Sequence, residues 1–308
     1  MIEPLRPQTL RPGDSVALVS PSGPVPAERV EQAVAVLTSW GLKPHVYPHV
    51  LKRFGYFGGT DEERATDLNA ALNDPQMRAI WCTRGGYGVQ RIVDRLDLEA
   101  ITRDPKLIIG FSDITALHLA LWRRVRLATV HGPVAAQLDR GAGSVTALGA
   151  FHAIMTDRPV TIEADAAEPT YPVRVAGQAT GPLVGGNLSI VAATLGTPDW
   201  PDLAGTVLLL EDVNEEPYRV DRMLTQLLRS HALDALAGVA IGQFTDCGSG
   251  DEVVEVLAER LGALGVPVLG GLPVGHGEQH VAVPLGTRAT LDTDTGTLTV
   301  EAVTLARA

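Results

Sequence analysis

Ser112 lies where a short apolar run meets a helix, a place where a hydroxyl can become a nucleophile. Residues 107–110 (LIIG) read as a buried strand, and the following helix carries Ile114 and Leu117 on one side. Amides at the start of such a helix are unpaired and lie at the positive end of its dipole, so they can stabilise an oxyanion. The alternative is that Ser112 or Asp113 only caps the helix.

A serine hydroxyl needs a base near neutral pH, and the base needs a group that orients it. Glu211 follows the apolar strand 206–210, where a carboxylate is costly unless it has a partner. His276 lies between two glycines after another apolar strand. The order Ser, acid, His is one in which catalytic triads are built. The sequence has 8 histidines, so other combinations remain open.

Two glycine-rich segments are possible binding loops. The segment 84–88 (RGGYG) follows a predicted strand at 79–83, and its backbone amides could approach an anion. The segment 185–187 (GGN) is a second such place. Neither matches the dinucleotide fingerprint or the P-loop spacing. Each is equally well explained as a tight turn with close backbone packing.

Composition excludes several classes of function. The net charge of -11 argues against nucleic acid or an anionic membrane as partner, because both favour clustered Lys and Arg. We see no signal peptide and no apolar run near the ~20 residues that span a bilayer, so we expect a cytoplasmic protein. Cys82 and Cys247 are expected to be core residues, and no His or Cys spacing suggests a metal site.

The order of elements predicts an α/β fold with two domains. Strands and helices alternate through the first half, which is typical of a largely parallel sheet in flavodoxin-like or Rossmann-like layers. Near residues 164–181, Pro, Gly and small polar residues dominate. We therefore predict an N-terminal domain over 1–163 with the nucleophile, a linker over 164–181, and a smaller C-terminal α/β domain over 182–308. The alternating segment 288–300 predicts a hairpin.

A series of ordered blocks resembles a known family. The blocks are LRPGDSVALVSPSGPV, GTDEERATDLNAAL, AIWCTRGGYGVQRIVDRLD, LIIGFSDITALHLAL, GPLVGGNLSIVAATLGTP, LLLEDVNEEPYRVDRMLTQL and LPVGHG. Together they are similar to the muramoyl-tetrapeptide LD-carboxypeptidases, which are serine peptidases. The similarity extends over nearly the whole chain.

The resemblance implies roles for individual residues. The catalytic triad would be Ser112, Glu211 and His276, and the oxyanion hole would use the backbone of Gly86 and Asp113. Gly85 and Asn187 are expected substrate contacts. The implied reaction removes terminal D-alanine from an L-diamino acid in murein tetrapeptides during cell-wall recycling. It needs no metal or organic cofactor, and the enzyme would be a homodimer.

Two other functions remain open. One branch of the same family cleaves peptidyl or aminoacyl nucleotide antibiotics and confers immunity to microcin C. The segment 215–227 fits the murein branch better, whereas the segment 275–286 departs from the usual pattern and leaves substrate preference open. From another class, a noncatalytic α/β protein could bind a ligand with the RGGYG and GGN loops.

Overall fold

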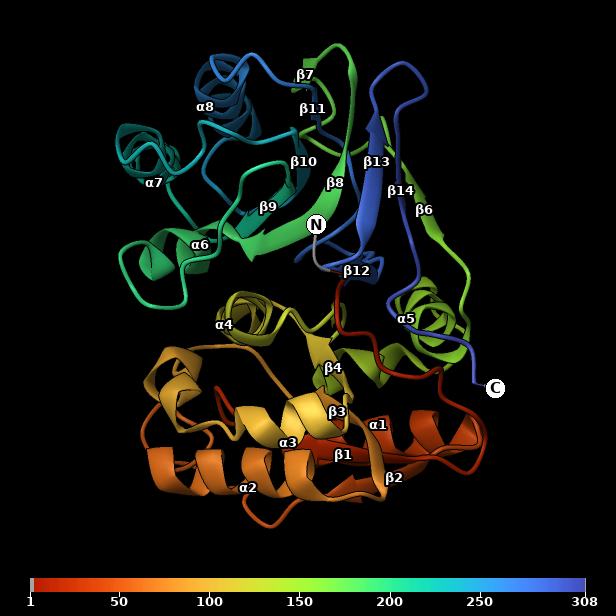
Figure 1. The fold of residues 1–308 in the computed structure, drawn as a ribbon. Helices are drawn as coiled ribbons and strands as arrows, with labels where there is room; N and C mark the ends of the chain where they lie inside the picture. Colours follow the sequence, from red (N-terminus) through yellow and green to blue (C-terminus); the bar gives the residue numbers. More distant parts are fainter. Residues whose placement is uncertain (1–2, 308) are drawn as a thin grey trace.

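The computed structural model describes residues 3–307, which form two sheets flanked by helices (Figure 1). In the first sheet the strand order is β12-β5-β4-β3-β1-β2. The strands are β1 (Ser15–Val19), β2 (Lys43–Val46), β3 (Met77–Cys82), β4 (Leu107–Gly110), β5 (Thr129–His131) and β12 (Val283–Leu285). Strands β1 to β5 are parallel and β12 is antiparallel to β5, which confirms the predicted largely parallel N-terminal sheet.

Helices cover both faces of this sheet, so its strands β1, β3 and β4 are buried on both sides. In β1, Val16 and Leu18 join the core beneath α1 (Ala27–Ser39) and α5 (Val145–Met155). The alternate residues Ala17 and Val19 face α2 (Asp61–Asn73), α3 (Leu98–Arg103) and α4 (Thr115–Val125). This alternation follows from the two-residue period of a strand.

Helix α2 begins with a capping box. The Glu63 amide donates to Thr60 Oγ1 at 3.2 Å, and the Thr60 amide donates to Glu63 Oε2 at 2.8 Å. Two amides that lack partners within the helix are thereby satisfied. The capping box places the N-terminus of α2 beside the loops that end β1 and β3.

The second sheet has eight strands in the order β6-β14-β13-β8-β9-β10-β11-β7. They are β6 (Val160–Glu163), β7 (Arg174–Val175), β8 (Gln178–Asn187), β9 (Val207–Val213), β10 (Gly238–Thr245), β11 (Val268–Leu269), β13 (Arg288–Asp292) and β14 (Thr297–Val300). Strands β8 to β11 are parallel and the others are antiparallel. The antiparallel β13–β14 pair confirms the predicted hairpin.

One face of this sheet packs against three helices. They are α6 (Leu188–Thr194), α7 (Pro217–Arg229) and α8 (Gly250–Gly262). Leu208 and Leu210 of β9 join that core, whereas Leu209 points to the opposite face with Leu291 and Val283. Strand β9 is therefore buried on both sides, which explains its continuous apolar sequence.

Two strands cross the predicted division of the chain. Strand β6 lies at the end of the segment 1–163 but pairs with β14 in the second sheet. Strand β12 comes from the segment 182–308 but pairs with β5 in the first sheet. The segment 164–181 contains β7 and the start of β8. The assignment of 1–163, 164–181 and 182–308 as domain, linker and domain stays a prediction.

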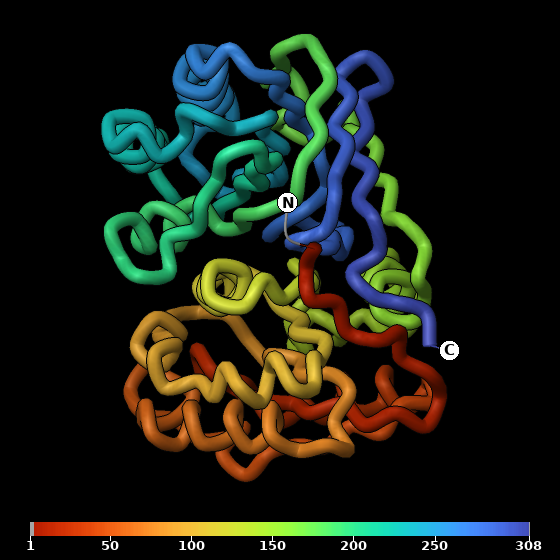
Figure 2. Tube along the Cα trace, viewed as in Figure 1, coloured from red at the N-terminus to blue at the C-terminus, as the bar shows by residue number. Residues whose placement is uncertain are grey.

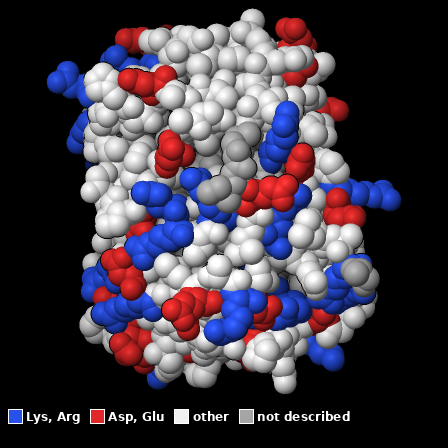
Figure 3. Space-filling view, in the orientation of Figure 1, with Lys and Arg blue, Asp and Glu red and all other residues white. Residues whose placement is uncertain are grey.

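The two ends of the chain also join the two parts. The Thr9 amide donates to the Leu305 carbonyl at 3.0 Å, and the first and last segments run side by side in Figure 2. On the face shown in Figure 3, Lys and Arg are interspersed with Asp and Glu. Within residues 3–307, no helix has the length and hydrophobicity to cross a bilayer. Both cysteines are buried, as predicted.

Candidate active site

Ser112 lies on a strained turn at the carboxyl end of β4. Its φ is +64°, a left-handed conformation that is uncommon for a residue other than glycine. A short 3-10 helix, Ser112–Ile114, follows at once and leads into α4. In this backbone conformation the Ser112 side chain is partly exposed at the edge of the sheet, whereas its neighbours Phe111 and Asp113 are buried. This is the strand–turn–helix geometry of a nucleophile elbow.

Two backbone amides lie free beside Ser112. Gly86 has a φ of +123°, and Asp113 begins the 3-10 helix after the elbow. Among residues 3–307, no hydrogen bond uses the amide of Gly86 or that of Asp113. Free amides at such a turn suit a developing negative charge. The arrangement is compatible with the oxyanion hole expected from the sequence, which stays a prediction.

Gly85 must be a glycine because Ser112 touches it. A Cβ atom at position 85 would lie 2.8 Å from Ser112 Cβ and 2.9 Å from Ser112 Oγ. We therefore expect Gly85→Ala to displace the hydroxyl and lower kcat about 10²-fold, since misplacement by about 1 Å can cost that much. Gly143→Ala is the matched control because a Cβ there has no neighbour within 4 Å. Equal kcat values for the two variants would contradict the role of the Ser112 hydroxyl.

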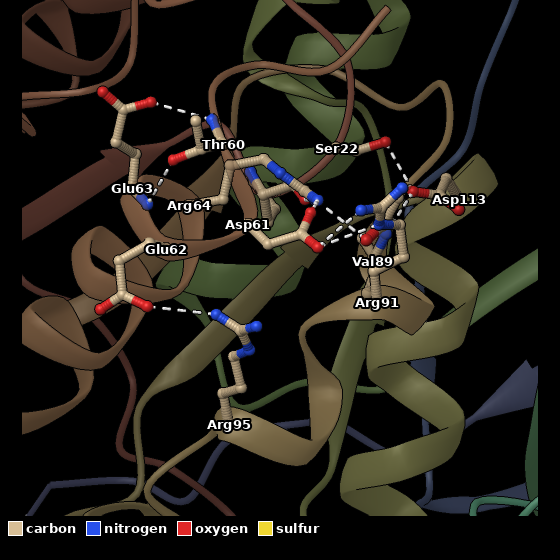
Figure 4. A network of polar contacts seen from close by, with 12 residues as sticks. Ser22, Thr60, Asp61, Glu62, Glu63, Arg64, Val89, Arg91, Arg95 and Asp113 are labelled. Atoms are coloured by element: carbon tan, nitrogen blue, oxygen red, sulfur yellow. Dashed lines mark hydrogen bonds and ion pairs between the residues drawn. The ribbon is translucent and has the colours of Figure 1, made fainter. Parts of the chain in front are cut away.

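The Asp113 carboxylate braces the turn. Its Oδ2 accepts from the Ser22 hydroxyl at 2.6 Å and from the Val89 amide at 3.0 Å (Figure 4). Arg64, from α2, donates to the Gly88 carbonyl at 2.9 Å. Burial raises the pKa of Asp113, and these hydrogen bonds act in the opposite direction. The side chain therefore ties the loops after β1 and β3 to the elbow.

Glu211 and His276 form a buried pair. Glu211 Oε2 lies 2.6 Å from His276 Nδ1, and the Glu211 side chain is 0% exposed. Gly275 permits this approach, because a Cβ there would lie 2.8 Å from Glu211 Oε2. Burial raises the pKa of Glu211, whereas the hydrogen bond with His276 lowers it. His276 Nδ1 donates a hydrogen bond to the carboxylate, and the other ring nitrogen, Nε2, remains available to another group.

Phe111 links this pair to the elbow. The rings of Phe111 and His276 lie 4.5 Å apart between centroids, so the imidazole packs against the residue before Ser112. Within the described residues, no hydrogen bond joins Ser112 to His276. Such contacts are often long in enzymes without substrate and tighten on binding. The structure brings the two residues to one region without forming the hydrogen bond itself.

A histidine cluster behind the pair was missing from the predicted site. The rings of Phe111 and His280 lie 4.4 Å apart, and those of His131 and His280 lie 5.5 Å apart. Both histidines are buried, and none of their four ring nitrogens has a partner among the described residues. Burial lowers the pKa of His280 to about 3, so this ring is neutral.

The GGN segment lies against the start of α4. The Asn187 amide donates to Thr115 Oγ1 at 3.0 Å. Its side chain accepts from the Ile190 amide at 3.3 Å, which caps α6, and donates to Asp212 at 3.0 Å. Gly186 is required because a Cβ would lie 2.6 Å from Thr115 Oγ1. Asn187 thus supports the loop next to Glu211, and its direct contact with substrate stays a prediction.

His118 has a packing role. It is buried, and its Nε2 lies 2.8 Å from the Gly110 carbonyl at the end of β4. Burial lowers the pKa of His118 to about 4, so the ring is neutral and donates this hydrogen bond. The contact fixes α4 to the strand that carries Ser112.

Two domain models of a peptidase family match this chain. The LD-carboxypeptidase N-terminal domain model matches residues 16–132, and the LD-carboxypeptidase C-terminal domain model matches residues 180–291. A Streptomyces coelicolor protein named as a carboxypeptidase is 48% identical, over 98% of this chain and 97% of its own. The murein tetrapeptide carboxypeptidase of Pseudomonas aeruginosa is 35% identical, over 92% and 95% of the two chains.

A solved structure shares the fold. The microcin C7 self-immunity protein MccF, in complex with glutamyl sulfamoyl guanosine, superposes with a TM-score of 0.86. It is 25% identical, and the alignment covers 97% of this chain and 98% of that one. The two matched domain models together cover most of the chain. The protein described here therefore belongs to the LD-carboxypeptidase family.

Proposed function

We propose that the protein is a serine LD-carboxypeptidase that hydrolyses the bond between an L-diamino acid and terminal D-alanine in murein tetrapeptides. The observation that carries the proposal is the Glu211–His276 pair packed against the strained turn of Ser112. The 35% identity with the murein tetrapeptide carboxypeptidase of Pseudomonas aeruginosa supports the substrate class.

The proposed reaction begins when His276 Nε2 removes the Ser112 proton as the oxygen attacks the scissile carbonyl. Glu211 holds the imidazole in the tautomer with a proton on Nδ1 and stabilises the imidazolium that forms. The amides of Gly86 and Asp113 stabilise the tetrahedral oxyanion. His276 then gives its proton to the leaving D-alanine amine, and water hydrolyses the acyl-enzyme.

The second candidate is cleavage of a peptidyl or aminoacyl nucleotide, and the fold shared with MccF favours it. A substrate panel separates the two functions. The purified protein is incubated with a murein tetrapeptide and with a peptidyl-adenylate analogue, and the products are identified by mass spectrometry. Release of D-alanine supports the murein assignment, whereas cleavage of the analogue alone supports the immunity type. Binding without cleavage of either would indicate a noncatalytic protein.

Activity should survive exhaustive chelation, because the proposed triad activates its own nucleophile. Within residues 3–307, no group of three or more His, Cys, Asp or Glu is arranged to hold a metal ion. The measurement is D-alanine release before and after dialysis against EDTA, and we expect a change smaller than about twofold. Loss of activity that added Zn²⁺ or Mg²⁺ restores would contradict this prediction.

We also propose that the protein acts in the cytoplasm as a homodimer, without a nucleic acid partner. Its net charge of -11 supports the last point. Light scattering of the purified protein tests the dimer, since a mass of one chain would contradict it. Fractionation of the producing cells tests the location, since recovery outside the cytoplasm would contradict it.

A further inference from the structure

Two cavities flank the turn that follows His276. One has a volume of about 440 Å³ and the other about 460 Å³. Gly277 and Glu278 line both, so each cavity begins next to His276. The two openings are therefore positioned to receive different parts of a substrate bound at the site.

The charges of the two cavities differ. The larger cavity is lined by acidic residues that include Asp165, Glu168 and Asp246. Among the described residues that line it, there is no Lys, Arg or His. The smaller cavity is lined by three arginines, Arg29, Arg84 and Arg140, and by two acids, Asp139 and Glu278, so arginine is in excess there. A carboxylate would be repelled by the first lining and attracted by the second. The arginine-lined cavity is therefore the one suited to an anionic group.

Arg84 is the arginine best placed for that task. It directly precedes Gly85, which touches Ser112. Its guanidinium makes one hydrogen bond, to the Pro24 carbonyl at 2.8 Å, and is otherwise exposed. Arg29 already forms an ion pair with Asp139. The Arg84 guanidinium therefore has N–H groups available to donate to a carboxylate. A guanidinium can bind a carboxylate through two parallel hydrogen bonds.

The wall of this cavity also holds an unsatisfied polar group. His280 lines it and is 1% exposed, and neither of its ring nitrogens has a partner among residues 3–307. Buried polar groups are nearly always hydrogen-bonded in native proteins.

We propose that Arg84 is a specificity-determining residue that binds the terminal carboxylate of the substrate in this cavity. The inference rests on the proposed carboxypeptidase function and extends it. A carboxypeptidase must distinguish a free terminal carboxylate from a continuing chain. Arg84 precedes the glycine that contacts Ser112, so a carboxylate bound by Arg84 would direct the scissile carbonyl toward that serine.

The test compares a tetrapeptide that ends in D-alanine with the same peptide ending in D-alanine amide. For the wild type we expect kcat/KM to be much higher for the acid. In Arg84→Gln, kcat/KM for the acid should fall ~10- to 100-fold, mainly through KM, because a charge-assisted hydrogen bond is lost. The value for the amide should change little. Arg84→Lys should recover part of the loss because the charge is retained.

Arg229→Gln is the matched control, since Arg229 is an exposed arginine in the last turn of α7 and lines neither cavity. An unchanged kcat/KM for the acid in Arg84→Gln would overturn the inference. So would an equal loss for both substrates, because Arg84 would then act only by holding its loop. If the wild type cleaves neither peptide, the proposed function itself fails, which is a distinguishable result.

Discussion

Replacement of Ser112, His276 or Glu211 by alanine is expected to reduce kcat for D-alanine release more than any other single change. We expect a loss of ~10⁴- to 10⁶-fold for Ser112→Ala and His276→Ala, because either change removes the activated nucleophile. The loss for Glu211→Ala should be smaller but still ~10⁴-fold, because the imidazole would lose its orienting partner. The measurement is steady-state kinetics on a murein tetrapeptide.

The decisive readout is the double variant. Residues that act as one unit are not additive, so Ser112→Ala/His276→Ala should be about as slow as Ser112→Ala alone. Circular dichroism and thermal unfolding serve as controls that the fold is retained. Losses that multiply across the two positions would contradict a triad. Full activity of Ser112→Ala would remove the nucleophile assignment altogether.

The second large effect concerns stereochemistry at the terminal residue. A tetrapeptide that ends in D-alanine should be cleaved at least ~10²-fold faster than the same peptide ending in L-alanine. Inverting that centre exchanges the positions of the methyl group and the carboxylate. If the carboxylate stays bound, either the methyl group clashes with the wall of the site or the scissile carbonyl shifts away from Ser112. Misplacement by about 1 Å is enough for such a loss.

Steady-state comparison of kcat/KM for the two peptides tests this prediction. Synthetic peptides that differ only at the terminal centre provide the matched pair. Equal values would rule out LD-carboxypeptidase specificity even if Ser112 proved to be the nucleophile. The immunity-type reaction would then become the preferred function, and the peptidyl-adenylate analogue would be the substrate to examine.

Much of the local structure could be predicted from the sequence because its causes are local. The apolar runs that form β3, β4 and β9 are buried on both faces, and a capping box at Thr60 starts α2. The strand–serine–helix order around Ser112 also indicated an elbow. Turn residues and short-range hydrogen bonds determine such features, so neighbouring residues suffice to predict them.

The ordered blocks of sequence carried the family assignment, which the domain models confirmed. They also named Glu211 and His276 as partners. Residue spacing alone left many alternatives among the 8 histidines. A contact between residues 65 positions apart depends on how strands pair, and no local pattern encodes that pairing.

Tertiary structure decided which buried polar groups meet. No local pattern indicated that β6 and β12 would each join the other sheet, or that Asp113 would accept hydrogen bonds from Ser22 and Val89. The 2.6 Å contact between Glu211 and His276 exists because β9 carries the carboxylate into the core while Gly275 lets the His276 loop approach it. A buried carboxylate is costly without a partner, and only packing of the whole chain supplies that partner.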